Sequence, residues 1–181
     1  GFGEVVVGAQ LQPKHLVHNL TARRQHDEGR CDAMLTQITA DIAAGHSLGE
    51  FSALCYAGVF SFEDGVRLVQ QRGALMAEAV SSSPGSMAAV IGLNSDDLAA
   101  VLAEGRKAGI VEPANYNAVD QTVVSGEAAA VAKVVQSVKA LGRGRAIPLK
   151  VGAPFHSSIM APGAIEFERV LKEVTLARPR I

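Results

Sequence analysis

Tryptophan is absent from this 181-residue sequence, aromatic residues make up only 4% of it, and only two residues are cysteines. Two cysteines, Cys31 and Cys55, are too few for the disulfide framework of a small secreted protein, so we expect a reducing, cytoplasmic setting. No apolar run reaches the roughly 18 residues that favour a membrane-spanning helix, so no membrane partner is expected. The formal net charge of −1 provides no basic surface for nucleic acid. The 48% hydrophobic content predicts a globular chain with an ordinary core.

The first readable elements surround a short run of small residues. Residues 38–45, ITADIAAG, predict a buried strand that ends at Gly45. A helix is predicted directly after it, in LGEFSALCYAGVF. Residues 61–80 predict a second helix, with Ser61 as its N-cap and acidic residues in its first turn. The polar Pro/Gly stretch SSSPGS that follows is typical of a domain boundary.

Beyond this boundary the elements alternate regularly. Strand, helix, strand, strand, helix and strand are predicted in MAAVIGL, SDDLAAVLAEGRKAG, IVEPANYNA, QTVVSG, EAAAVAKVVQSVKALG and RAIPLKVGAP. This order is that of the ferredoxin-like fold, in which two helices cover one face of a four-stranded antiparallel sheet. We therefore expect a ferredoxin-like βαββαβ small subdomain over residues 84–156, inserted into a larger α/β subdomain of residues 1–83 and 157–181.

Gly45-His46-Ser47-Leu48-Gly49 fits the pattern G-x-S-x-G of a nucleophile elbow, in which a strand turns sharply into a helix and presents a strained serine. The two glycines are expected because a side chain at either position would clash as the helix folds back. The alternative is a structural turn whose serine only caps the helix.

A serine hydroxyl becomes a good nucleophile only when a base removes its proton. Downstream of Ser47 the single histidine is His156, in APFHSS at the junction of the two predicted subdomains. A residue at such a junction can overhang a cleft. His156 is therefore the candidate base, and the alternative is a histidine in a surface loop.

The helix over 61–80 carries a cation on its predicted apolar face. That face comprises Val66, Val69, Gly73, Met76 and Val80. Arg72 lies within it, and burying a guanidinium without an anion is costly. The anion could be an internal carboxylate, or the side chain could snorkel along the helix. A substrate carboxylate held by the guanidinium fork would instead predict acyl transfer through Ser47.

Four linked segments, AGHSLGEFSAL, VRLVQQRGALM, ANYNAVDQTVVSG and VGAPFHSSIMAP, resemble the malonyl-CoA:acyl carrier protein transacylase family and the related acyltransferase domains of polyketide synthases. The resemblance runs from about residue 40 to the C-terminus. It implies an α/β-hydrolase-like large subdomain around the small one. It also implies that Ser47 carries the malonyl group as an ester and that His156 is the base and later the acid.

The same resemblance implies the roles of the substrate-binding residues. Arg72 would hold the malonyl carboxylate, and the backbone N–H of Leu48 would help to hold the oxyanion. Phe155 matches the pattern of the family members that prefer malonyl. An aromatic wall there would crowd an extra methyl group. The remaining substrate-binding candidates are Met76, Asn115 and Asn117, although the two asparagines could equally be turn-forming residues.

The reaction implied is a ping-pong transfer that uses malonyl-CoA and the phosphopantetheine thiol of acyl carrier protein, with no metal or redox cofactor and with a monomeric enzyme. The family's glutamine-containing opening loop has no clear counterpart in GFGEVVVGAQLQP, and its C-terminal third is absent, so an internal fragment is expected.

Three other functions stay open. One is the acyltransferase of a polyketide synthase system. Another is a hydrolase-type thioesterase or esterase, which needs an acid between the serine and the histidine. By position, Asp64, Asp96, Asp97 and Asp120 are available for that role. The last is an inactive remnant that only binds carrier protein.

Overall fold

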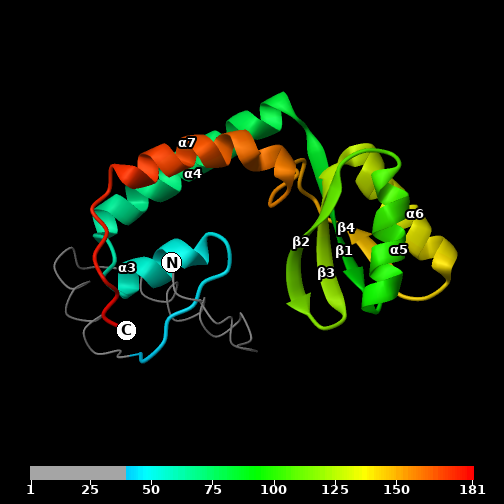
Figure 1. The fold of residues 1–181 in the computed structure, drawn as a ribbon, viewed down its shortest axis with the longest axis horizontal. Coiled ribbons are helices and arrows are strands. Elements are labelled where there is room, and N and C mark those ends of the chain that lie inside the picture. Colours follow the sequence, from blue (N-terminus) through cyan, green and yellow to red (C-terminus); the bar gives the residue numbers. More distant parts are fainter. Residues whose placement is uncertain (1–39) are drawn as a thin grey trace, which may run out of the picture. The chain divides into compact units, whose positions relative to one another are not determined.

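A computed structural model describes residues 40–181 of the chain (Figure 1). These residues divide into two compact units, one of residues 40–65 with 176–181 and one of residues 66–175. The elements, in chain order, are α3 (Gly49–Tyr56), α4 (Phe62–Ser82), β1 (Gly85–Ile91), α5 (Ser95–Arg106), β2 (Val111–Ala118), β3 (Gln121–Glu127), α6 (Ala128–Leu141), β4 (Arg145–Pro148), the 3-10 helix η1 (Ser158–Met160) and α7 (Ala161–Lys172). The predicted subdomain boundaries at 83/84 and 156/157 stay a prediction, and residues 1–39 of the predicted large subdomain lie outside the described residues.

The second unit contains a four-stranded sheet with the strand order β2-β3-β1-β4, in which all neighbours are antiparallel. In its centre, Ala89 of β1 lies opposite Val123 of β3 on one side and Ile147 of β4 on the other. The order strand, helix, strand, strand, helix, strand is the one expected from the sequence. Short runs of apolar and small residues in β1 and β3, which are buried on both faces, and a 3.6-residue period in the helices account for this success.

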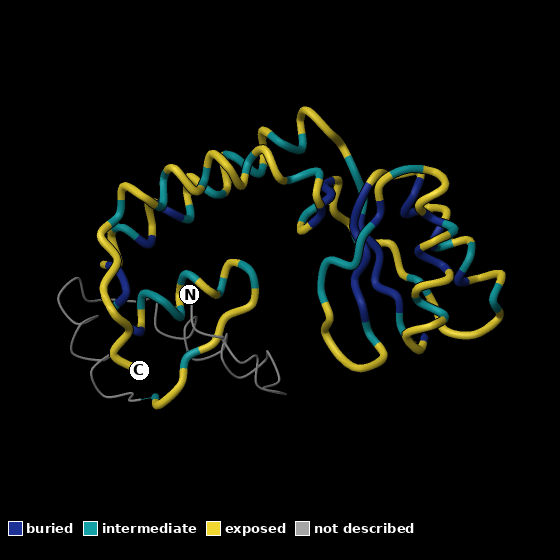
Figure 2. The backbone as a smooth tube through the Cα atoms, viewed as in Figure 1, coloured by how far each residue is buried: buried dark blue, intermediate teal, exposed yellow. Residues whose placement is uncertain are grey.

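Helices α5 and α6 cover the first face of the sheet (Figures 1 and 2). The core between the helices and the sheet consists of small and β-branched residues: Ala88, Val90, Leu93, Val101, Leu102, Val111, Val124, Ala130, Val131, Val134 and Val138. Gly105 lets α5 approach α6 closely, because a Cβ at this position would overlap the side chain of Val134 in α6. Asn94 Oδ1 caps α5 by accepting a hydrogen bond from Asp97 N at 2.8 Å.

The second face of the sheet is covered by the chain that follows β4. Met87, Ala89 and Val123 are buried there, and Phe155 packs against them. Pro154 is fully buried, and a Cβ on Gly85 would press into its ring. The predicted last strand, residues 145–154, is therefore wrong beyond Pro148. Sheet-like bonding ends with Leu149 N, which donates to Met87 O at 2.9 Å, and the chain then crosses the face.

Helix α4 begins with the predicted cap. Asp64 N donates to Ser61 Oγ at 3.0 Å, and Ser61 Oγ donates to Asp64 Oδ2 at 2.6 Å. Helix α7 lies against α4 at one point, since a Cβ on Gly163 would be 3.6 Å from Leu75 O. Within residues 40–181, no helix is both long and apolar enough to cross a membrane.

The first unit holds α3 together with the last residues of the chain. Ala177 N donates to Val59 O at 2.8 Å, and Arg180 N donates to Ala57 O at 2.9 Å. The predicted buried strand before α3 is wrong over residues 40–45, which form no strand and expose 81% of Ile42. A strand needs a partner for its backbone groups, and the four paired strands of the described chain lie between residues 85 and 148.

Candidate functional site

Ser47 lies at the tip of a tight turn that leads into α3. His46 O accepts a hydrogen bond from Gly49 N at 3.0 Å, and Ser47 O accepts one from Glu50 N at 3.2 Å. Ser47 has φ 53°, in the left-handed region that L-residues rarely adopt. The turn has the strain and the sharp entry into a helix of a nucleophile elbow, although no strand precedes it over residues 40–45.

The two glycines of the motif have different surroundings. A Cβ on Gly45 would overlap the carbonyl group of Gly49, so this turn accepts only glycine at position 45, as predicted. A Cβ on Gly49 would meet no atom of the described residues within 4 Å. The clash predicted at Gly49 is therefore not found in the part of the chain that is described.

Leu48 is the N-cap residue of α3, and its side chain is half exposed. Backbone N–H groups in the first turn of a helix have no partner within the helix, and the helix dipole favours negative charge there. The N–H of the residue after the serine is also an oxyanion donor in nucleophile elbows. The oxyanion role of Leu48 stays a prediction.

Arg72 and Met76 are one turn apart on α4, and both are half buried. The buried face of this helix runs through Leu68, which is 1% exposed, and through Leu75. Arg72 is four residues after the first and three before the second, so it lies on this face. The predicted face is displaced, however, since Val66 is 51% exposed. Apolar residues lie around the helix on both sides of Arg72. The prediction took the side with Val66 and therefore left out Leu68 and Leu75.

His156 lies in a second strained turn. Its φ is 60°, and its side chain is exposed. Ser157 Oγ donates to Pro154 O at 2.6 Å, which closes the turn around His156. Ser158 N donates to Glu112 Oε2, also at 2.6 Å, and this bond links the turn to β2.

Asn115 and Phe155 lie on the same face of the sheet. Asn115 is directly opposite Val123 in the β2–β3 pair, and directly opposed residues point to the same side. Val123 is also one of the residues against which Phe155 packs. Asn117 is not part of this arrangement, because it is exposed at a register irregularity between Tyr116 and Ala118.

The acids available to a hydrolase are engaged elsewhere or exposed. Asp64 is bonded to Ser61, and Asp97 Oδ2 accepts a hydrogen bond from Arg143 Nε at 2.7 Å. That bond and the charge of Arg143 lower the pKa of Asp97. Asp96 and Asp120 are exposed.

The roles of two residues in the second unit were not predicted from the sequence. Glu112 looks like an ordinary polar strand residue, and its bond to Ser158, 46 residues later, has no sequence signal. Ser125 is fully buried, and its Oγ has no hydrogen-bond partner among the described residues. It lies opposite Glu112 in β3.

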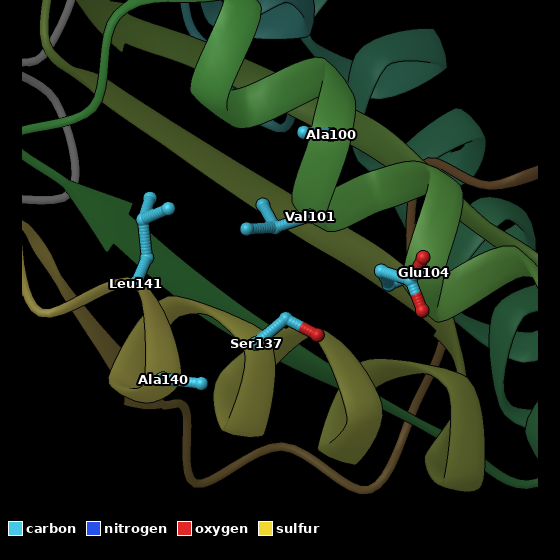
Figure 3. A pocket seen from close by; sticks show the side chains of 6 residues that line it. All are labelled: Ala100, Val101, Glu104, Ser137, Ala140 and Leu141. Carbon is cyan, nitrogen blue, oxygen red and sulfur yellow. The ribbon is translucent and has the colours of Figure 1, made fainter.

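A groove of about 330 Å³ lies between α5 and α6 (Figure 3). Its lining residues are Ala100, Val101, Glu104, Ser137, Ala140 and Leu141. None of them is a predicted site residue, and both helices cover the face of the sheet opposite to Phe155. In residues 40–181 no group of three or more His, Cys, Asp or Glu side chains could hold a metal ion.

Comparison with known proteins relates these features to a family. The acyl transferase domain family matches residues 32–181. The malonyl CoA-acyl carrier protein transacylase of Escherichia coli K12 is 39% identical over 174 residues, which are 95% of this chain and 54% of that protein. The enzyme of the same name from Staphylococcus aureus MRSA252 is 48% identical over 131 residues, 71% of this chain and 42% of that protein.

Solved structures agree with the sequence matches. A malonyl CoA-acyl carrier protein transacylase from Clostridium perfringens has a TM-score of 0.76 and 40% identity, covering 82% of this chain and 46% of that one. A malonyl-transacylase in complex with its type II PKS acyl-carrier protein has a TM-score of 0.75 and 40% identity. The match covers 80% of this chain and 47% of that one. The chain spans about half the length of the curated relatives that it matches. With an α/β fold like theirs and a family match over most of its length, the chain belongs to the acyl transferase domain family.

Proposed function

We propose that this chain carries the malonyl-transfer site of an enzyme that moves malonyl from malonyl-CoA to the phosphopantetheine thiol of acyl carrier protein. The observation that supports this most is the backbone strain at Ser47 and His156, the residues expected to act as nucleophile and base. Strained backbone persists only where the surrounding structure imposes it, and it concentrates at active sites. The names of the relatives supply the substrate class.

The reaction has two half-reactions. In the first, His156 takes the proton of Ser47 Oγ, which attacks the thioester carbonyl of malonyl-CoA. Leu48 N–H holds the oxyanion, and the C–S bond then breaks while His156 returns the proton to the leaving coenzyme A thiolate. In the second, His156 takes the proton of the carrier thiol, whose sulfur attacks the malonyl ester. Ser47 leaves with that proton, so the enzyme is regenerated.

In this proposal Arg72 makes the enzyme selective for malonyl over acetyl. Arg72 is half buried on the buried face of α4, and its guanidinium would pair with the free carboxylate of malonyl. An acetyl group would leave that cation without a substrate carboxylate. Met76, one turn further along α4, and Phe155 and Asn115 would form the surrounding wall. Asn117 is exposed near the end of β2 and would lie outside it.

The proposed architecture follows the same family. We assign residues 84–156 to a ferredoxin-like subdomain inserted into an α/β-hydrolase-like one, supported by the strand order β2-β3-β1-β4. The proposed reaction needs no metal or redox cofactor, because serine, histidine and backbone donors perform every step. We further propose that the enzyme is a cytoplasmic monomer and that acyl carrier protein is its partner.

A second pathway has specific support. One relative with 40% identity was solved in complex with its type II PKS acyl-carrier protein. The same malonyl transfer could therefore supply a polyketide system instead of fatty acid synthesis. Comparing the rate with carrier proteins of each kind would distinguish the two pathways.

The proposal is tested by isotope exchange without carrier protein. In a ping-pong mechanism the chain alone exchanges labelled coenzyme A into malonyl-CoA, because the first half-reaction is reversible. Adding phosphopantetheinylated carrier protein should then yield malonyl carrier protein. Exchange that persists in Ser47→Ala, or transfer that requires both substrates at once, would refute the proposal, and release of free malonate would favour a thioesterase. Carrier binding without exchange would favour an inactive remnant.

A further inference from the structure

Ser158 N donates to a carboxylate of β2, Glu112 Oε2, at 2.6 Å. Ser158 is the first residue of η1, where backbone N–H groups have no partner within the helix. The N-cap residue Ser157 makes no capping bond, since its hydroxyl donates to Pro154 O instead. Glu112 therefore supplies the acceptor that the local sequence does not, and a charged acceptor makes the bond stronger than a neutral one would.

This bond lies two residues after His156, whose φ of 60° is unfavourable for a residue with a side chain. Three restraints surround that residue. Before it, Phe155 packs on Met87, Ala89 and Val123 of the sheet. Across it, Ser157 Oγ bonds to Pro154 O. After it, Glu112 holds Ser158 N.

Of these three restraints, the one from Glu112 is carried by the strand that also carries Asn115. Glu112 is opposite Ser125 and Asn115 is opposite Val123, with the register irregularity of β2 between them. The strand pair is buried along β3 from Thr122 to Gly126, so it is a rigid support. A rotation of the His156 turn would have to break the hydrogen bond between Ser158 N and the Glu112 carboxylate.

From these contacts we infer that Glu112 is a positioning residue for His156: it fixes the backbone of the His156 turn so that the imidazole stays oriented toward its substrate. The inference rests on the proposed role of His156 as the base. General base catalysis depends on geometry first, and small displacements of a catalytic group reduce the rate strongly. Glu112 touches no reacting atom in this scheme, and it acts only through the turn.

Two substitutions of Glu112 distinguish the effect of its hydrogen bond from the effect of its side-chain volume. Glu112→Gln keeps an acceptor oxygen at the same length, whereas Glu112→Ala removes it. We expect Glu112→Ala to slow single-turnover acylation of Ser47 by about tenfold, with the half-saturating malonyl-CoA concentration unchanged. Glu112→Gln should restore most of the rate. A purely structural role would instead lower the unfolding temperature of Glu112→Ala and leave the acylation rate of its folded fraction at the parent level.

A second measurement does not depend on activity. The ring proton signals of His156, assigned by their loss in His156→Asn, should move toward those of an unstructured histidine in Glu112→Ala and stay in place in Glu112→Gln. Unmoved signals in Glu112→Ala overturn the inference, as does an acylation rate at the parent level while His156→Asn abolishes it. Displaced signals in a chain that never acylates Ser47 would refute the proposed function and still support the positioning role.

Discussion

Ser47 and His156 share a backbone conformation that no other non-glycine residue of the described chain adopts, with φ values of 53° and 60°. The two residues belong to different compact units and are 109 positions apart in the sequence. Each turn has its own restraints. Bonds from Gly49 N and Glu50 N close the first, where Gly45 leaves room for the Gly49 carbonyl, and bonds from Ser157 and Ser158 hold the second. The coincidence of strain with the nucleophile and base chosen from sequence is the main support for the proposed chemistry.

Gly45→Ala should destroy the Ser47 turn. The added Cβ would overlap the Gly49 carbonyl, so the backbone must shift and carry Ser47 with it. We expect acylation to fall by about 10²-fold or more. Gly49→Ala is the matched control, because no described atom lies within 4 Å of its Cβ. Equal losses of acylation in the two variants, measured at equal folded fraction by circular dichroism, would contradict this account of the turn.

Arg72→Ala should remove discrimination between malonyl-CoA and acetyl-CoA. In the proposed mechanism the guanidinium would pair with the carboxylate that acetyl lacks, so we expect the ratio of kcat/KM values to fall by about 10²-fold. Arg67→Ala, at an exposed position of the same helix, is the control and should keep the preference. An Arg72→Ala enzyme that still prefers malonyl would show that the carboxylate is held elsewhere.

Ser125→Ala should leave the protein equally stable or more stable by about 1 kcal/mol, because it removes a buried hydroxyl without a hydrogen-bond partner among the described residues. Ser157→Ala is a suitable comparison, since that hydroxyl is buried and bonded to Pro154 O. It should destabilise by about 1 kcal/mol. Urea unfolding of both variants measures the difference. A clear loss of stability in Ser125→Ala would indicate a partner for this hydroxyl.

The bond between Asp97 and Arg143 should make stability depend on pH in the acid range. The hydrogen bond and the charge of Arg143 lower the pKa of Asp97 in the folded state below its ordinary value of 3.8. The bond therefore contributes stability above the unfolded pKa, and that contribution disappears as the pH falls through the folded one. Asp97→Asn should be less stable than the parent at neutral pH and equally stable at the acid limit. A stability difference that is constant with pH would contradict this.

Local patterns allowed much of the second unit to be predicted. The short apolar runs of β1 and β3, the period of α5 and α6 and the Ser61 cap are all short-range signals, and the structure has each of these elements. The strained turn at Ser47 and the position of Arg72 on the buried face of α4 were also predictable, since they depend on residues within a few positions.

The errors arise where distant residues decide the structure. Residues 40–45 have strand-like composition but no pairing partner among the described strands, so Ile42 is exposed. The chain after Pro148 looks like a continuing strand, yet packing of Pro154 on Gly85 takes it across the sheet. Glu112 was missed for the same reason, because its partner Ser158 is 46 residues away.

The central claim, a malonyl ester on Ser47, is tested most directly by intact mass spectrometry after brief exposure to malonyl-CoA, followed by peptide mapping. The account predicts one malonyl group on the peptide that contains Ser47, no adduct in Ser47→Ala, and a much smaller adduct with acetyl-CoA. A malonyl group on another residue, or an adduct that survives in Ser47→Ala, would contradict it.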